Sequence, residues 1–228
     1  VGDSKQLPPT TFFTRGLDDD DILDDEDMTE VDSILEEAVA SGIEQLALGW
    51  HYRSRHESLI TFSNHFYYDR RLNTFPSAAH QSDTLGVEYR HIPHGFYDRG
   101  RSRTNRAEAE AVVAELVQRL QTEERRTTSI GVVTFSMPQQ RLIENLVDDM
   151  LHAHPEFESY FRTETDEYIF VKNLENVQGD ERDVMLFSIG YGPDRTGKVT
   201  MNFGPLNRQG GERRLNVAIT RAREKTLI

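Results

Sequence analysis

The chain has 228 residues, of which 26 are Lys or Arg, 39 are Asp or Glu and none is Cys. The absence of cysteine excludes disulfide frameworks, thiolate zinc sites and cysteine nucleophiles. No apolar run reaches the roughly 20 residues that cross a bilayer. We therefore expect a globular protein of the cytoplasmic type, with one large domain or two small ones.

The net charge of −13 is concentrated in one stretch of the chain. Residues 18–37 hold twelve acidic side chains and no Lys or Arg, which leaves a balance of −1 for the remainder. Blocks of like charge stay solvated, so we expect a surface insertion there. A calcium loop is disfavoured, because residues 18–27 lack the glycine that such loops need. Apolar residues at helical spacing predict a short helix within residues 28–41.

Strand-like and helix-like segments alternate from residue 46 onward. Apolar runs predict strands at residues 46–50, 86–92, 130–135, 168–171 and 184–189. Helical spacing of apolar residues predicts helices at residues 58–66, 105–120, 137–151 and 213–224. Ser136 and Gln139 form a capping box at the start of the third of these helices, with proline in its first turn. The alternation predicts an α/β fold, a parallel sheet flanked by helices on both faces, with functional side chains at the carboxyl ends of the strands.

Residues 192–198 match G-x-x-x-x-G-K, the start of a phosphate-binding loop. The next residue, Val199, lacks the hydroxyl that would hold Mg²⁺. Residues 199–203, with Pro205 soon after them, cannot form the helix whose amino end would hold the phosphates. We expect a glycine-rich turn between two strands instead. A magnesium-binding acidic pair is missing as well, since Asp166 and Glu167 precede their predicted strand rather than end it. The residues therefore predict that this chain cannot hold ATP and Mg²⁺ by itself.

Four further segments combine unusual residue types in a fixed order. They are residues 2–9 (GDSKQLPP), 50–57 (WHYRSRHE), 173–181 (NLENVQGDE) and 213–223 (RRLNVAITRAR). Each has a plain reading when taken alone, as a turn, a surface arginine pair, a loop or a basic helix face. Each also fits phosphate chemistry, since the planar fork of arginine suits phosphate oxygens and a rigidly held arginine can stabilise developing charge.

Taken together, these segments, with FSN at residues 62–64, resemble the motifs of superfamily 1 helicases. The nearest branch is that of the nonsense-mediated-decay helicase, in a prokaryotic subgroup, because His51 and residues 54–57 depart from the eukaryotic pattern. The resemblance implies a RecA-like second lobe of the P-loop NTPase fold that lacks its own phosphate loop. It also implies a piece of a longer polypeptide: residues 1–45 would be the tail of the first lobe with an acidic insertion or linker, and residues 46–228 the second lobe, truncated at its carboxyl end.

The resemblance implies a set of ATP contacts, residue by residue. Gln6, Arg53 and Arg221 match catalytic positions: Gln6 senses the γ-phosphate, Arg53 contacts it, and Arg221 is the arginine finger. Glu181 matches the residue that binds the ATP ribose, and Gly179 belongs to the same cofactor-binding loop. These roles suit phosphoryl transfer, which depends mostly on positioning and electrostatics.

The resemblance also implies contacts with nucleic acid from loops that follow strands. Thr134 and Asn176 match positions that hold the phosphate backbone without reading sequence. Arg99, Arg101, Arg103 and Arg106 form a further basic cluster, for which ordinary solvated arginines are the alternative.

The function implied is that of the C-terminal motor lobe of an ATP-dependent helicase, an ATP hydrolase that moves on single-stranded nucleic acid, DNA rather than RNA. ATP and Mg²⁺ would be held mainly by the first lobe of the same polypeptide, so we expect the chain alone to be inactive and to have no metal site. One alternative is a binding module with a degenerate RecA-like fold and no motor. The other is a nuclease, for which residues 18–27 offer carboxylates without a scaffolded pair.

Overall fold

The computed structural model describes residues 2–6, 34–77, 82–123, 126–164 and 167–228. Within these ranges the helices are α1 (Ile34–Ala40), α2 (Ser58–Phe66), α3 (Arg106–Gln121), α4 (Met137–Ala153) and α5 (Gly211–Ile219), with short 3-10 helices η1 (Pro155–Phe161) and η2 (Gly204–Asn207). The strands are β1 (Trp50–His51), β2 (Asn73–Thr74), β3 (Gly86–Glu88), β4 (Ile130–Thr134), β5 (Phe170–Asn173), β6 (Arg182–Ser188) and β7 (Ala222–Leu227). None of the described helices is both long and apolar enough to span a bilayer.

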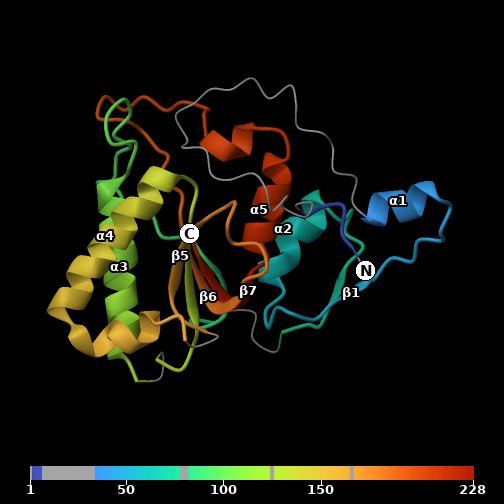
Figure 1. The fold of residues 1–228 in the computed structure, drawn as a ribbon, viewed down its shortest axis with the longest axis horizontal. Helices are drawn as coiled ribbons and strands as arrows, with labels where there is room; N and C mark the ends of the chain where they lie inside the picture. Colours follow the sequence, from blue (N-terminus) through green and yellow to red (C-terminus); the bar gives the residue numbers. More distant parts are fainter. Residues whose placement is uncertain (1, 7–33, 78–81, 124–125, 165–166) are drawn as a thin grey trace.

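The core of the structure is a five-stranded parallel sheet with the strand order β3-β7-β6-β4-β5. Helices α3 and α4 cover one face, and α2 and α5 cover the other (Figure 1). Strands β1 and β2 form a separate parallel pair. The expected fold class, a RecA-like parallel sheet flanked by helices, is confirmed.

The middle residues of the central strands β4 and β6 are apolar because both faces of these strands are buried. On β4, Val132 packs into the cluster under α3 and α4, and Val133 packs into the cluster under α5. Leu186 and Phe187 alternate between the same two clusters on the neighbouring β6. This is the pattern expected of a doubly covered parallel sheet, and it explains why the sequence predicted β4 and β6 well.

Side-chain caps fix the starts of the two long helices. The side chain of Asn105 accepts a hydrogen bond from the Glu108 amide at the start of α3, and that of Ser136 accepts one from the Gln139 amide at the start of α4. Such caps satisfy amides that the first helical turn leaves without partners. The Ser136 half of the predicted capping box is therefore confirmed, whereas the Gln139 side chain bonds to Asn105 and Ser188 instead of returning to the Ser136 amide.

The helix predicted over residues 213–224 is wrong in its second half, because α5 ends at Ile219 and β7 begins at Ala222. Thr220 donates its hydroxyl to the carbonyls of Asn216 and Val217, and the Arg221 Nε donates to the same Val217 carbonyl at 2.8 Å. These side chains satisfy the carbonyls that a helix end leaves open. The chain can therefore turn directly into the sheet.

Other predicted segments are shorter than expected or lie elsewhere. The predicted strand at residues 86–92 is confined to β3, and that at 46–50 to a β1 of two residues, with Leu46 and Leu48 largely exposed. In the glycine-rich turn at residues 192–198, the Asp194 side chain accepts the backbone amides of Thr196 and Lys198. The turn lies between β6 and η2, not between two strands as predicted. Of the acidic run, residues 18–33 are outside the described ranges, and α1 occupies part of the predicted helix beyond them.

Gly131 in the middle of β4 offers a sharp test of this packing. A β-carbon added there would lie 2.6 Å from Cζ of Phe170 and 2.8 Å from Sδ of Met185. We expect Gly131→Ala to lower the free energy of unfolding by about 1–3 kcal/mol through overpacking, measured by urea denaturation. Gly192→Ala is the matched control, since a β-carbon there meets nothing within 4 Å; equal stability of the two variants would contradict the described packing.

Candidate functional site

Two arginines and a glutamate meet at the amino ends of β6 and β7. Glu181 directly precedes β6, and Arg221 directly precedes β7. Arg53, from the segment between β1 and α2, places Nε 2.9 Å from the Glu181 carboxylate and donates Nη1 to the Thr220 carbonyl at 3.3 Å. The structure thus brings together side chains that the sequence placed in three separate motifs.

Arg221 is the most buried member of this group, at 5% exposure. Its Nε donates to the Val217 carbonyl at 2.8 Å, and its Nη2 donates to Oε1 of Gln6 at 3.3 Å. Burial, followed by the neighbouring positive charge of Arg53, lowers the pKa of Arg221, while Glu181 acts in the opposite direction. A guanidinium that is desolvated beside a second guanidinium is strongly attracted to an added anion.

Gln6 is held in place by a chain of hydrogen bonds to the second half of the sequence. Its Nε2 donates to Asp3 at 2.9 Å, and the same carboxylate accepts the hydroxyl of Tyr68 at 2.7 Å. Asn216 on α5 donates both to that hydroxyl and to the Lys5 carbonyl. Burial, together with the bond to Asp3, raises the pKa of Tyr68 to about 12. Residues 2–6 are thereby fixed against α5. We refer to Arg53, Glu181 and Arg221 as the arginine cluster, and Gln6 contacts this cluster through Arg221.

The segment that carries Arg53 has its own support. Ser54 donates its backbone amide to Nε2 of His51 at 3.2 Å, and the two side chains are 2.8 Å apart. Burial and the charge of Arg53 lower the pKa of His51, so the neutral ring that accepts this bond is favoured. At 35% and 40% side-chain exposure, the ion pair between Arg53 and Glu181 is open to solvent. Such pairs contribute little to folding, so Arg53 can exchange its partner for another anion at low cost.

Gly179 lies in the loop that leads to Glu181, and it has a left-handed backbone with φ of 94°. Open space surrounds the position where a β-carbon would stand, so the loop backbone can be approached closely. Next to it, Asp180 is 2.6 Å from Nζ of Lys172, which ties the loop to β5. Sequence reasoning placed Gly179 here but missed the supporting lysine, because no local pattern marks a contact between a strand and the loop beyond it.

Arg223, Tyr68 and Asn216 are supporting residues that the sequence did not single out for the site. Arg223 lies 3.8 Å from the Glu181 carboxylate and is itself held by Asp183 at 2.9 Å. Residues 222–227 place four polar residues in a row between Ala222 and Leu227, so no apolar alternation indicated a strand or this placement of Arg223. Tyr68 and Asn216 act through partners distant in sequence, which the sequence alone does not reveal.

The two residues predicted to contact nucleic acid lie at the opposite edge of the sheet, at the carboxyl ends of β4 and β5. Thr134 is fully buried, and its hydroxyl donates to the Ser136 carbonyl at 3.1 Å. The prediction that the Thr134 side chain contacts a nucleic-acid strand is therefore corrected. This side chain stabilises the turn after β4 and is not accessible to a ligand. Asn176 is exposed in the loop after β5, within reach of a ligand.

The sequence predicted functional side chains at the carboxyl edge of the sheet, and of the candidate residues only Thr134 and Asn176 lie there. The arginine cluster lies at the amino edge, one strand length away, which for the seven residues of β6 is roughly 20 Å. The physical reason is that Glu181 and Arg221 come just before their strands, in segments that cross back from the carboxyl edge.

The arginine cluster suits the phosphate and ribose parts of a nucleotide better than it suits a metal ion. Arg53 and Arg221 supply planar donors for phosphate oxygens, and Glu181 supplies a half-exposed acceptor for hydroxyls. Within the described ranges, no group of three or more acidic or histidine side chains could hold a metal ion. Magnesium therefore does not fit the residues of this cluster.

Comparisons with known proteins place these features in context. Residues 31–228 match the family model described as AAA domain. The chain is 36% identical to the ATP-dependent helicase MG140 of Mycoplasma genitalium and 34% identical to its homologue in Mycoplasma pneumoniae, over 99% of this chain in both cases. It spans about a fifth of the length of these relatives, 20% in each. The solved C-terminal domain of a possible DNA helicase from Lactobacillus plantarum WCFS1 aligns with a TM-score of 0.40 and 14% identity, over 77% of this chain and 85% of that one.

The shifted pKa of His51 predicts a pH dependence for this region. Because folding lowers the pKa of His51 below its ordinary value of 6.5, its contribution to stability is present above pH 6.5 and is lost as the pH falls from there through the folded-state value. We expect His51→Gln to flatten the loss of stability on acidification, measured by urea unfolding above and below pH 6.5. His152→Gln, an exposed position on α4, is the control; an identical pH profile for His51→Gln and the unaltered chain would contradict this role.

Proposed function

Because this chain belongs to the AAA domain family, we propose that it is the C-terminal, second RecA-like motor lobe of a superfamily 1 ATP-dependent helicase, in a prokaryotic subgroup of the nonsense-mediated-decay branch. The observation that carries the proposal is the meeting of Arg53, Glu181 and Arg221 with Gln6 in one site. The names of its Mycoplasma relatives, ATP-dependent helicases, support the same conclusion.

In this proposal the chain supplies the cationic half of a nucleotide site. Arg53 and Arg221 bind the phosphate end of ATP, and Arg221 neutralises the charge that develops during phosphoryl transfer. Glu181 binds the ribose, and Gln6 links the nucleotide to residues 2–6. The other half, a phosphate loop with Mg²⁺, comes from a first lobe in the same polypeptide, so the site is complete only when the two lobes close.

The buried setting of Arg221 supports this role, since its side chain is already oriented by two hydrogen bonds. A finger that is held before the nucleotide arrives loses little side-chain entropy on binding. The half-buried Arg53 is then the adjustable contact: when the lobes close, its guanidinium group exchanges the Glu181 carboxylate for the phosphate.

Single-stranded nucleic acid, DNA rather than RNA, is the proposed track. Exposed groups at the carboxyl edge of the sheet, among them Asn176, bind its backbone without reading sequence. Placing nucleotide and nucleic acid at opposite edges of one rigid sheet lets lobe closure at one edge move the strand at the other.

We expect Arg221→Ala to reduce ATP turnover by about a thousandfold or more in the longer polypeptide that carries both lobes, as the loss of an arginine finger does elsewhere. Arg221 also caps α5, so its removal can affect folding as well as turnover. Arg53→Ala is therefore measured in parallel, and this variant should lose ATP turnover without loss of folding. The control is Arg55→Ala, whose side chain is 68% exposed and pairs with Glu224 instead. Near-normal turnover in both Arg221→Ala and Arg53→Ala would remove the assignment.

The chain of 228 residues alone should not hydrolyse ATP appreciably, because its described residues offer no cluster for a metal ion and no phosphate loop. A steady-state phosphate-release assay on the purified chain tests this expectation. Robust turnover that disappears with Arg221→Ala would mean that the chain is a complete ATPase. Nucleic-acid binding by the longer polypeptide without any nucleotide-dependent strand separation would favour a binding module with no motor.

A further inference from the structure

Two loops lie side by side beyond the carboxyl edge of the sheet, one at residues 93–104 before α3 and one at residues 190–203 after β6. Tyr97 donates its backbone amide to the Pro193 carbonyl at 2.8 Å, and the rings of Tyr97 and Tyr191 are 5.3 Å apart. Figure 1 shows the loop before α3 and the loop after β6 meeting at one end of the molecule. We refer to these residues as the loop pair.

Crossed ion pairs join the two loops. Arg99 approaches Asp194 at 3.8 Å, and Arg195 approaches Asp98 at 3.9 Å, so each loop contributes one base and one acid. Both aspartates are also engaged in shaping their own turns: Asp98 accepts the Ser102 hydroxyl, and Asp194 accepts two backbone amides. The ion pairs are long, and the acids have other partners, so the guanidinium groups remain able to bind an added anion.

The loop pair carries more positive than negative charge, unlike the chain as a whole. Against the two aspartates stand five basic side chains: Arg99, Arg101, Arg103, Arg195 and Lys198. Four of the five residues are exposed, Arg99 being the half-buried exception. Since charges are screened beyond about 10 Å at 0.1 M salt, this local excess decides which ligand the surface attracts.

The loop pair is mounted rigidly on the sheet by a buried polar network. Glu108, in the first turn of α3, accepts the amide of Gly190 at 3.0 Å and the hydroxyl of Ser188 at 3.0 Å. Gln139, fully buried on α4, donates to the same hydroxyl and exchanges two hydrogen bonds with the backbone of Asn105. Such a satisfied network fixes the geometry of its members. It therefore ties the end of one loop and the start of the other to a single position.

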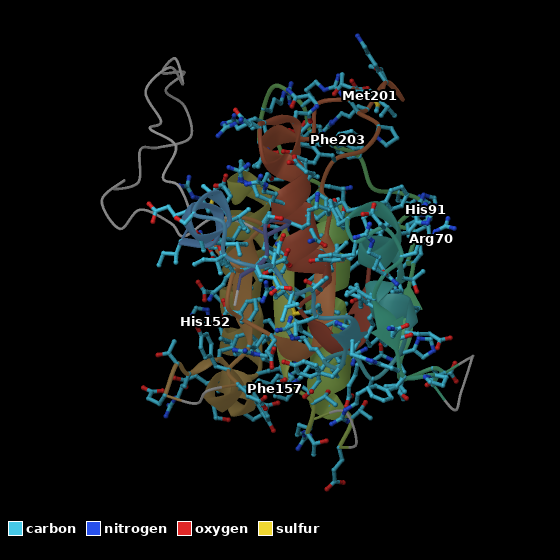
Figure 2. The ribbon with its side chains drawn as sticks, turned by 90° about the vertical axis from the view of Figure 1, so that its right-hand side faces the viewer. Arg70, His91, His152, Phe157, Met201 and Phe203 are labelled. Carbon is cyan, nitrogen blue, oxygen red and sulfur yellow. The ribbon has the colours of Figure 1, made fainter. Side chains whose placement is uncertain are left out.

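Apolar side chains stand among these charges. Arg195 lies 4.6 Å from the ring centre of Phe96, Phe203 packs edge-on against Tyr191, and Met201 is 77% exposed. Figure 2 shows Met201 and Phe203 at one end of the molecule and Phe157 near the other. A basic surface interleaved with aromatic and apolar side chains is typical of proteins that bind single strands, in which cations hold phosphates and rings stack on bases.

We propose that the loop pair is the surface of this chain that grips single-stranded nucleic acid, with Arg101, Arg103 and Arg195 on the phosphates and Phe96 against a base. This inference rests on the proposed function and extends it, since it places the strand on residues outside the helicase-like motifs. The strand runs along the carboxyl edge past Asn176. Binding is independent of base sequence, because guanidinium–phosphate contacts carry no sequence information.

The test uses the purified chain and a fluorescent oligothymidylate of about 15 nucleotides, with affinity followed by anisotropy between about 50 and 200 mM salt. The double variant Arg101→Ala with Arg103→Ala should weaken binding about tenfold or more. It should also reduce the slope of log affinity against log salt concentration by roughly 1.4, or about 0.7 for each phosphate that is no longer neutralised. Arg162→Ala removes an exposed arginine directly after η1, the element that carries Phe157, and should leave affinity unchanged.

A second pair of variants separates binding from folding. Arg103 has a left-handed backbone with φ of 56°, which glycine adopts without strain, so Arg103→Gly should keep the thermal stability of the chain while weakening binding. Arg103→Lys keeps the charge and should keep the salt slope. Unchanged affinity in the double variant, a preference for duplex, or equal competition by polyglutamate would each overturn the inference.

The outcome for the proposed function is read separately. Arg55→Ala, an exposed position outside both proposed sites that pairs with Glu224, should bind the oligonucleotide as the unaltered chain does. If the unaltered chain binds and the loop variants bind equally well, the loop pair is excluded and the motor assignment stands. If ATP turnover in the longer polypeptide is insensitive to Arg53 and Arg221 while the loop variants lose binding, the motor assignment fails and the binding surface stands.

Discussion

The arrangement around the amino ends of β6 and β7 depends on one electrostatic constraint, the placing of two guanidinium groups beside the carboxylate of Glu181. Arg53 and Arg221 repel each other, and burial sharpens the effect at Arg221. Folding tolerates this because backbone carbonyls and Gln6 orient the two groups while Glu181 partly neutralises them. A phosphate chain would complete the neutralisation. The charges of this site are therefore suited to the polyanion that we propose as its ligand.

Much of this arrangement could be predicted from local patterns. The apolar runs at β4 and β6 and the caps of α3 and α4 are marked by short-range signals, since burial on both faces and unpaired helical amides restrict the residue types allowed. The grouping of Gln6, Arg53, Glu181 and Arg221 was expected only through the resemblance to helicases. Nothing local to any one of these residues indicates the others.

The misses have equally physical causes. The end of α5 is set by side-chain hydrogen bonds of Thr220 and Arg221 to their own helix, and helical periodicity does not report such bonds. Thr134 looks available in sequence because it ends a strand, yet two flanking strands and the turn after β4 enclose it completely. Glu181 and Arg221 lie at the amino edge of the sheet, not at the predicted carboxyl edge, because the loops that carry them return across the sheet before β6 and β7 begin.

The most direct measurement of the central claim is a structure of the longer polypeptide with a non-hydrolysable ATP analogue and Mg²⁺. The guanidinium groups of Arg53 and Arg221 should then lie at hydrogen-bonding distance, about 3 Å, from the γ-phosphate oxygens, with Glu181 against the ribose. A nucleotide bound elsewhere, with Arg53 still paired to Glu181 and Arg221 still bonded to Gln6, would contradict the claim.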